Sequence, residues 1–244
     1  MPYHHILLDI DNTLTDFPKS FAAAAKKVLT LGGHADDNES AAEYFRYNDE
    51  SWFGFELDHI ERADIRRDYH KLYNRYLYES TAKAKKEMNL LGSVEELQAC
   101  FEKNLGALSV PSPHALEVCR KLSENHTLSI ATNGLSRVQP LKLTAFMPYI
   151  SHVYVSEDVG RIKPEREYFE YILNDLGCEA SDCIMVGDSL PNDIGGANGA
   201  GIASCYYNPA GKTADYDKPD RATGLDTTPK YMIKDFNELL RILS

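Results

Sequence analysis

The sequence has few cysteines, and their spacing argues against a fold built on them. Only five of 244 residues are cysteine, an odd number, and no two are spaced as Cys-x-x-Cys. Disulfide scaffolds and structural zinc sites usually need paired cysteines at short, regular spacings. The sequence therefore predicts a chain without a disulfide framework or a zinc site, in a reducing compartment.

Long apolar runs and excess positive charge are also missing. No apolar run approaches the roughly 20 residues that a membrane span needs, and the first residues lead into a strand rather than a signal peptide. Lysine and arginine number 26 against 37 aspartate and glutamate, a net charge of −11. This excess of negative charge repels nucleic acid and anionic lipid. We expect a cytoplasmic protein whose partner is a small molecule, neither a nucleic acid polymer nor a membrane.

Two carboxylates follow an apolar run near the start of the chain. Ile6 to Leu8 are typical of a buried strand, and Asp9 and Asp11 come directly after it. Alternate side chains of a strand share a face, so these two should lie roughly 6 to 7 Å apart. Two like charges that close favour a cation between them or a proton on one of them. The alternative is a solvated turn, where Asp, Asn and Thr are common.

Composition divides the chain into two parts. Residues 36–108 lack proline and show amphipathic helical periods, which predicts an all-helical module. After it, strands predicted at 127–131, 152–155, 183–186 and 203–206 alternate with helices at 114–125, 136–146 and 165–176. This alternation is typical of a parallel sheet. The predicted fold class is α/β, with a Rossmann-like parallel-sheet core of residues 1–16 and 108–244 and an inserted helical domain of residues 17–107.

Polar residues follow the second and third predicted strands, where ligands of such sheets bind. Thr132 and Asn133 offer a hydroxyl and backbone N–H groups that suit a phosphate, although an ordinary strand-to-helix turn would look the same. Ser136 is placed to cap the helix predicted next. Lys163 is kept extended by Pro164, which favours a first helical position, so its ammonium can reach the strand ends. The alternative for Lys163 is a solvated surface charge.

Two further carboxylates follow the predicted strand 183–186. Asp188 comes nearly directly after the strand, and Asp193 opens a helix of small residues. Carboxylate oxygens are the ligands that Mg²⁺ prefers, and Asp188 is the better placed of the two. Asp193 could equally cap the helix or support the metal ligands from behind.

Together these residues resemble the haloacid dehalogenase superfamily of phosphatases. That superfamily has DxDxT followed by an apolar residue, then a threonine, a lysine and GDSxxxD, in this order. The matching residues are Asp9, Asp11, Thr13, Leu14, Thr132, Lys163, Asp188 and Asp193. The helical insert is similar to the superfamily's mobile cap of the C1 type, so the resemblance covers the whole chain. DIDNTLTDF, NDESWFGFELDHI and GDSLPNDIGGANGAGIASCYYNP are similar to the pyrimidine 5′-nucleotidase branch.

The resemblance implies roles for the residues that match. Asp9 would be the nucleophile that takes the phosphoryl group, and Asp11 the general acid and then the base for the hydrolytic water. Thr132, the backbone N–H of Asn133 and Lys163 would hold the phosphate charge in the transition state. Lys163 therefore counts among both the catalytic and the phosphate-binding residues.

A magnesium ion is the cofactor that the resemblance implies. The Asp9 carboxylate, the Asp11 backbone carbonyl and Asp188 would hold it, and Asp193 would orient these ligands from behind. Asp11 also separates this chain from relatives with other chemistry, because dehalogenases and phosphonatases lack an acid at that position.

The substrate is the least determined property. The nucleotidase resemblance favours a nucleoside 5′-monophosphate, in particular a pyrimidine one. A phosphatase or phosphomutase of a small sugar phosphate shares all the motifs, and a catalytically silent binding module would keep the fold. The predicted cap has an aromatic cluster on which a base could stack, although such residues more often form a module's own core. They are Tyr44, Phe45, Tyr47, Trp52, Phe53 and Phe55.

Overall fold

The computed structural model describes residues 3–211 and 223–243. The chain forms two compact units: Met1–Asp16 together with Pro111–Ser244, and Phe17–Val110. Within the described residues, no helix combines the length and the apolar character needed to cross a bilayer.

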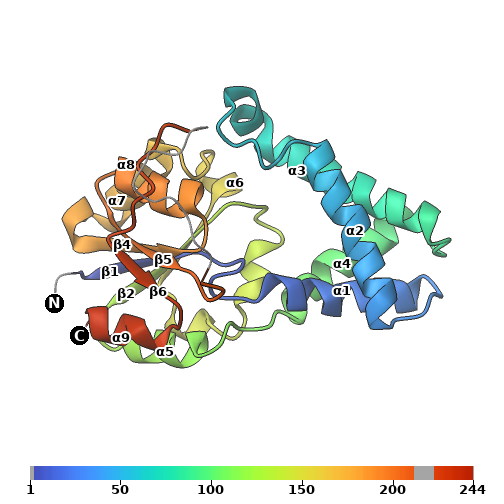
Figure 1. Cartoon of the computed structure of the whole chain (residues 1–244), viewed down its shortest axis with the longest axis horizontal. Coiled ribbons are helices and arrows are strands. Elements are labelled where there is room, and N and C mark those ends of the chain that lie inside the picture. The colour runs from blue at the N-terminus through green and yellow to red at the C-terminus, as the bar shows by residue number, and fades with distance from the viewer. Residues whose placement is uncertain (1–2, 212–222, 244) are drawn as a thin grey trace. The chain divides into compact units, whose positions relative to one another are not determined.

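The first unit is built on a six-stranded sheet in the order β3-β2-β1-β4-β5-β6 (Figure 1). All neighbouring strands are parallel. The strands are β1 (His5–Leu8), β2 (Thr127–Thr132), β3 (His152–Val155), β4 (Cys183–Gly187), β5 (Ala203–Tyr207) and β6 (Tyr231–Ile233). The prediction of an α/β fold with a parallel sheet is confirmed.

Helices cover both faces of this sheet (Figure 1). They are α5 (Ala115–Leu122), α6 (Ser156–Val159), α7 (Arg166–Leu176), α8 (Gly196–Gly199) and α9 (Asn237–Leu243). Ile6 and Leu8 of β1 point to the face covered by α5 and α9, whereas Leu7 points to the face covered by α7 and α8. Because side chains alternate along a strand, a fully buried β1 needs apolar residues at every position. This explains the uninterrupted apolar run before Asp9.

The helix predicted over residues 136–146 is wrong. The structure has one short 3₁₀-helix there, η1 (Gln139–Leu143), and a second, η2 (Met147–Tyr149), directly after this range. Pro140 and Pro148 each lack the N–H that an α-helix interior requires, and both lie in the first turn of a 3₁₀-helix. Two further short elements flank β4: the 3₁₀-helix η3 (Ala180–Asp182) and the π-helical turn η4 (Leu190–Gly195). The expectation that Pro164 takes the first helical position is also wrong, because α7 begins at Arg166, two residues later.

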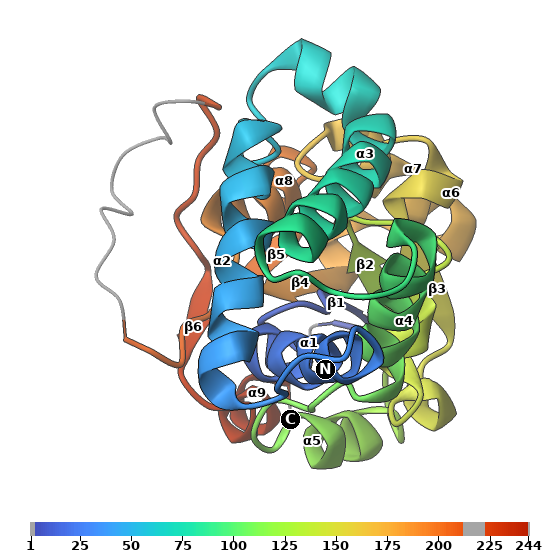
Figure 2. The same ribbon diagram turned by 90° about the vertical axis from the view of Figure 1, so that its right-hand side faces the viewer.

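The second unit consists of helices, and all of its residues are described. The helices of this unit are α1 (Phe17–Leu31), α2 (Asn38–Gly54), α3 (Ala63–Glu87) and α4 (Val94–Ala107). Helices α2 and α3 pack side by side (Figure 2). Tyr44 is 1% exposed and its ring contacts those of Phe21 and Phe101, so it belongs to the core of this unit. In contrast, Phe53 is 55% exposed.

Candidate active site

The parallel register brings the ends of β1, β2 and β4 level with one another. Leu8 pairs with Ile130 of β2 and with Val186 of β4. The Asp9 N–H continues the ladder and donates to the Val186 carbonyl at 3.0 Å. The strand order reverses at β1, and open α/β sheets bind ligands at the carboxyl edge of such a switch point. Asp9 lies at this place.

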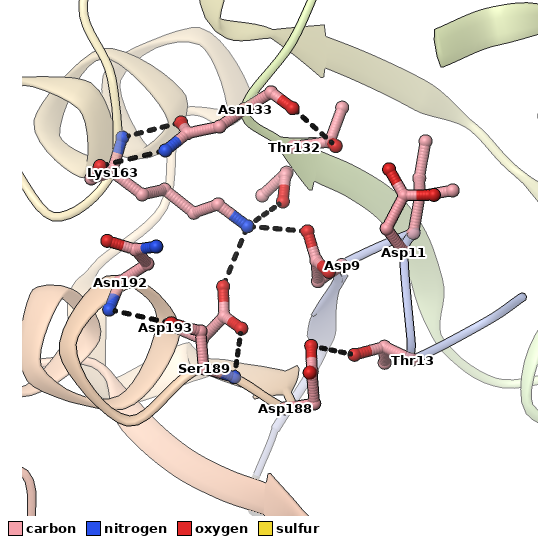
Figure 3. Close-up of polar contacts among 12 residues, drawn as sticks. Asp9, Asp11, Thr13, Thr132, Asn133, Lys163, Asp188, Ser189, Asn192 and Asp193 are labelled. Carbon is pink, nitrogen blue, oxygen red and sulfur yellow. Dashed lines mark hydrogen bonds and ion pairs between the residues drawn. The ribbon is translucent and has the colours of Figure 1, made fainter. Parts of the chain in front are cut away.

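The Lys163 ammonium lies among the polar groups of this edge (Figure 3). Its Nζ donates to Asp9 Oδ1 at 2.6 Å, to Asp193 Oδ1 at 2.7 Å and to the Ala131 carbonyl at 2.7 Å. These acceptors match the three hydrogens of an ammonium group. Lys163 is 2% exposed, so the alternative of a solvated surface charge is wrong.

Asp188 completes a cluster of carboxylates at the same edge. Carboxylate oxygens of Asp9, Asp188 and Asp193 all lie within 4.8 Å of one another. The Thr13 hydroxyl donates to Asp188 Oδ1 at 3.2 Å, which gives this threonine of the first motif a direct contact with the fourth (Figure 3). Asp193 Oδ2 accepts the Ser189 N–H at 2.9 Å. With one oxygen on Ser189 and one on Lys163, both oxygens of Asp193 are held by donors.

The electrostatics of this cluster favour a divalent cation. Burial raises the pKa of Asp9 to about 7 and that of Asp188 to about 8, and neighbouring carboxylates add to both shifts. Burial alone would lower the pKa of Lys163, but Asp193 and Asp9 outweigh it and raise that pKa. Three carboxylates and one ammonium leave a formal charge of −2. A hard dication with oxygen ligands, such as Mg²⁺, matches both this charge and these donors.

Asp11 is held by two residues that the sequence analysis missed. Lys142 Nζ lies 2.8 Å from Asp11 Oδ1 and 2.7 Å from Oδ2, and Gln139 Nε2 lies 3.2 Å from Oδ2. Both donors come from η1, where the prediction of an α-helix was wrong. A lysine between Leu141 and Leu143 was the one available signal, because a charged residue inside an apolar run has to find a partner if it is buried.

The two predicted phosphate-binding residues of the β2 end have different partners. The Thr132 hydroxyl accepts from Gln139 Nε2 at 2.7 Å. The Asn133 side chain donates to the Lys163 carbonyl at 2.9 Å and accepts the Lys163 N–H at 2.8 Å. The Asn133 side-chain amide therefore fixes the backbone that carries Lys163. The group of Asn133 that is assigned to a phosphate is its backbone N–H.

Ser136 does not cap a helix, since no helix begins there. Its hydroxyl donates to Asp158 at 2.6 Å, and its backbone N–H donates to Glu157 at 2.8 Å. Both carboxylates belong to α6, so Ser136 ties the loop after β2 to the helix after β3.

The family model for haloacid dehalogenase-like hydrolases matches residues 3–201. The chain belongs to this family. The match contains the ends of β1, β2, β3 and β4 and the whole helical unit. The predicted resemblance to the haloacid dehalogenase (HAD) superfamily is thereby confirmed.

The relatives of this haloacid dehalogenase-like hydrolase are named for different activities. The HAD-hydrolase YfnB of Bacillus subtilis is 28% identical over 246 residues, 99% of this chain and 96% of YfnB. Pyrimidine 5′-nucleotidase PynA of Streptococcus pneumoniae is 28% identical over 213 residues, 86% of this chain and 85% of PynA. Ribulose-1,5-bisphosphate 5-phosphatase of Halopiger xanaduensis is 28% identical over 232 residues, 89% of this chain and 90% of that protein.

A solved structure supports the same assignment of this haloacid dehalogenase-like hydrolase. The crystal structure of YfnB bound to magnesium matches with a TM-score of 0.77 at 26% identity, over 100% of both chains.

Proposed function

We propose that the protein is a magnesium-dependent phosphatase that hydrolyses nucleoside 5′-monophosphates, pyrimidine nucleotides in particular, through an aspartyl-phosphate intermediate. The observation that carries the proposal is the cluster of Asp9, Asp188 and Asp193 with Lys163 at the switch point of the sheet. It combines a nucleophile, a cation site and a fixed positive charge within a few ångströms. Phosphoryl transfer needs mainly positioning and charge stabilisation, which such a site supplies.

In the first half-reaction Asp9 is the nucleophile. One of its oxygens forms a bond to phosphorus while the bond from phosphorus to the leaving oxygen breaks. Asp11 gives its proton to that oxygen, because an alkoxide is a poor leaving group, and such general acid catalysis contributes about 10² to 10⁴ in rate. In the second half-reaction Asp11 takes a proton from the water that attacks the phosphoryl group. The bond between phosphorus and the Asp9 oxygen breaks, which releases inorganic phosphate and restores the Asp9 carboxylate.

The charge of the phosphoryl group meets fixed donors in both steps. Thr132 and the Asn133 N–H are assigned to its oxygens as donors, and the Lys163 ammonium, 2.6 Å from Asp9 Oδ1, is assigned to them as a positive charge. Bound magnesium would neutralise negative charge as the two anions approach, held by the Asp9 carboxylate, the Asp11 backbone carbonyl and Asp188. Asp193 keeps Lys163 and the cluster in place.

The substrate assignment rests on relatives and on sequence segments. PynA, a pyrimidine 5′-nucleotidase by name, aligns with 86% of this chain, and the segment NDESWFGFELDHI of the helical unit resembles that branch. A sugar phosphate is the second candidate, because a ribulose-1,5-bisphosphate 5-phosphatase aligns equally well at 28% identity. A silent binding module is disfavoured, since every residue assigned to the chemistry is present.

A substrate screen tests the proposal. Purified protein is assayed for phosphate release from dUMP, other nucleoside monophosphates and a panel of sugar phosphates, with Mg²⁺ or with EDTA. We expect turnover of dUMP that stops in EDTA and in the Asp9→Asn variant. Turnover of sugar phosphates alone would replace the nucleotidase assignment with the second candidate. Full activity of Asp9→Asn would contradict the mechanism itself.

A further inference from the structure

Two buried donors of η1 hold the Asp11 side chain, and neither belongs to the four motifs. Lys142 is 3% exposed and Gln139 is 1% exposed, whereas the Asp11 side chain is 30% exposed. Lysines usually keep the ammonium in water and bury only the aliphatic stem. Here the ammonium is buried and contacts both oxygens of Asp11, at 2.8 and 2.7 Å.

The donors leave a defined part of the carboxyl group open. A carboxyl group has about four lone-pair positions on its two oxygens. Lys142 uses one on Oδ1, while Lys142 and Gln139 together use both on Oδ2. The remaining position is on Oδ1. A proton that Asp11 exchanges with a bound molecule therefore has to pass through Oδ1.

Gln139 also connects Asp11 to a residue assigned to the phosphate. Its Nε2 lies 2.7 Å from the Thr132 hydroxyl and 3.2 Å from Asp11 Oδ2. One amide group therefore spans the ends of β1 and β2, and the orientation of Asp11 is fixed relative to the place assigned to the phosphate.

We propose that Lys142 and Gln139 are positioning residues that orient the Asp11 carboxyl group for proton transfer through Oδ1. The proposal rests on the role of Asp11 as general acid and base in the proposed function. Loss of either donor weakens the hold on the Asp11 side chain, so proton transfer to the leaving oxygen becomes less efficient. Attack by Asp9 on phosphorus is not changed directly.

Two aryl phosphates separate this role from a general structural one. 4-Nitrophenoxide leaves without much need for a proton, whereas phenoxide, with a parent phenol of pKa about 10, is a poorer leaving group. The two substrates are otherwise similar, and neither depends on nucleotide specificity. The measured quantity is the ratio of kcat/KM for 4-nitrophenyl phosphate to that for phenyl phosphate. Weaker phosphate binding or partial unfolding lowers both values equally and cancels in this ratio.

The variants are Lys142→Met and Gln139→Met, which keep the length and apolar character of the side chains. We expect the ratio to rise about tenfold in Lys142→Met, a part of what general acid catalysis contributes, and to rise also in Gln139→Met. Asp11→Asn is the reference and should give the largest increase. Lys121→Met, which removes an exposed partner of Glu117, is the control and should leave the ratio unchanged. Thermal unfolding of each variant establishes that it is folded.

The outcomes distinguish the two proposals. If Asp11→Asn raises the ratio but both η1 variants keep the value of the unaltered protein, the positioning role is wrong and the function of Asp11 stands. If Asp11→Asn also keeps that value, Asp11 is not the general acid, and the positioning role falls with it. Failure of the unaltered protein to hydrolyse either aryl phosphate contradicts the proposed function and both roles. If Lys142→Met does not fold, Gln139→Met alone tests the positioning role, because this variant retains the ion pair between Lys142 and Asp11.

Discussion

Lys163 and Asp193 form a buried ion pair, with Nζ and Oδ1 2.7 Å apart and side chains only 3% and 1% exposed. Asp9 shares the same ammonium at 2.6 Å. One lysine thus compensates two carboxylates directly, with the Asp188 carboxylate nearby. The carboxylates depend on the lysine, because the loss of the Lys163 ammonium would leave like charges close together in a buried environment.

Replacement of Lys163 should destabilise the folded protein as well as abolish activity. Removing one partner of a buried ion pair costs about 3 to 5 kcal/mol. We expect Lys163→Met to lower the free energy of unfolding in urea, measured in EDTA, by an amount of this order. The double variant Lys163→Met/Asp193→Asn should regain part of the loss, since one of the repelling carboxylates is gone. A double variant no more stable than Lys163→Met would contradict this account.

The stability of the metal-free protein should fall as the pH rises. The pKa of Asp188 is about 8 in the folded protein against an ordinary value of 3.8, and that of Asp9 is about 7. Between the ordinary pKa of 3.8 and these raised values, the folded state binds protons that the unfolded chain has released. The free energy of unfolding therefore decreases with increasing pH. Melting temperatures in EDTA from about pH 5 to pH 8 test this. Asp188→Asn should show a shallower decrease.

Magnesium should counteract the loss of stability at high pH. A ligand that binds only the folded state stabilises it, and protons compete with the cation for the same carboxylates. We therefore expect Mg²⁺ to raise the melting temperature more at high pH than at low pH. In Asp188→Asn the Mg²⁺-dependent increase should be largely lost. An equal increase in both proteins would place the cation elsewhere.

Gly187 should not tolerate a side chain. A Cβ atom at this position would lie 2.2 Å from Asp193 Oδ2. Asp193 would have to move, and with it Lys163, so we expect Gly187→Ala to lose activity and to be destabilised by about 1 to 3 kcal/mol. The control is Gly54→Ala, because a Cβ there meets no atom within 4 Å. Retention of full activity by Gly187→Ala would mean that Asp193 does not depend on this close approach.

The strand ends could be predicted from the sequence because a buried parallel strand is continuously apolar and stops abruptly. The predicted strand over residues 152–155 coincides with β3, and Asp9 follows β1 directly. The type and length of the helix around Pro140 were harder to predict than the strand ends. The polar and apolar spacing of residues 136–146 suits an α-helix, but the missing N–H of Pro140 leaves only the shorter η1.

The partners of Asp11 could not be predicted for a different reason. Lys142 and Gln139 lie about 130 positions along the chain from Asp11, and no short motif links them. Their contact depends on how η1 turns back toward the end of β1, which is a property of the tertiary structure. The Thr13 to Asp188 hydrogen bond is similar: both residues belong to motifs, but their contact follows from the register of β1 and β4.

The long insertion leaves and re-enters the sheet unit at one place. Thr15 forms a β-bridge with Pro111, and the Ser112 N–H donates to the Leu14 carbonyl at 2.9 Å. Two chain segments almost a hundred positions apart are thus held together close to the end of β1, and every residue assigned to the chemistry lies in the sheet unit. The insertion is thus a compact unit of its own, Phe17–Val110. Insertions or deletions within residues 17–110 therefore need not change any residue assigned to the reaction.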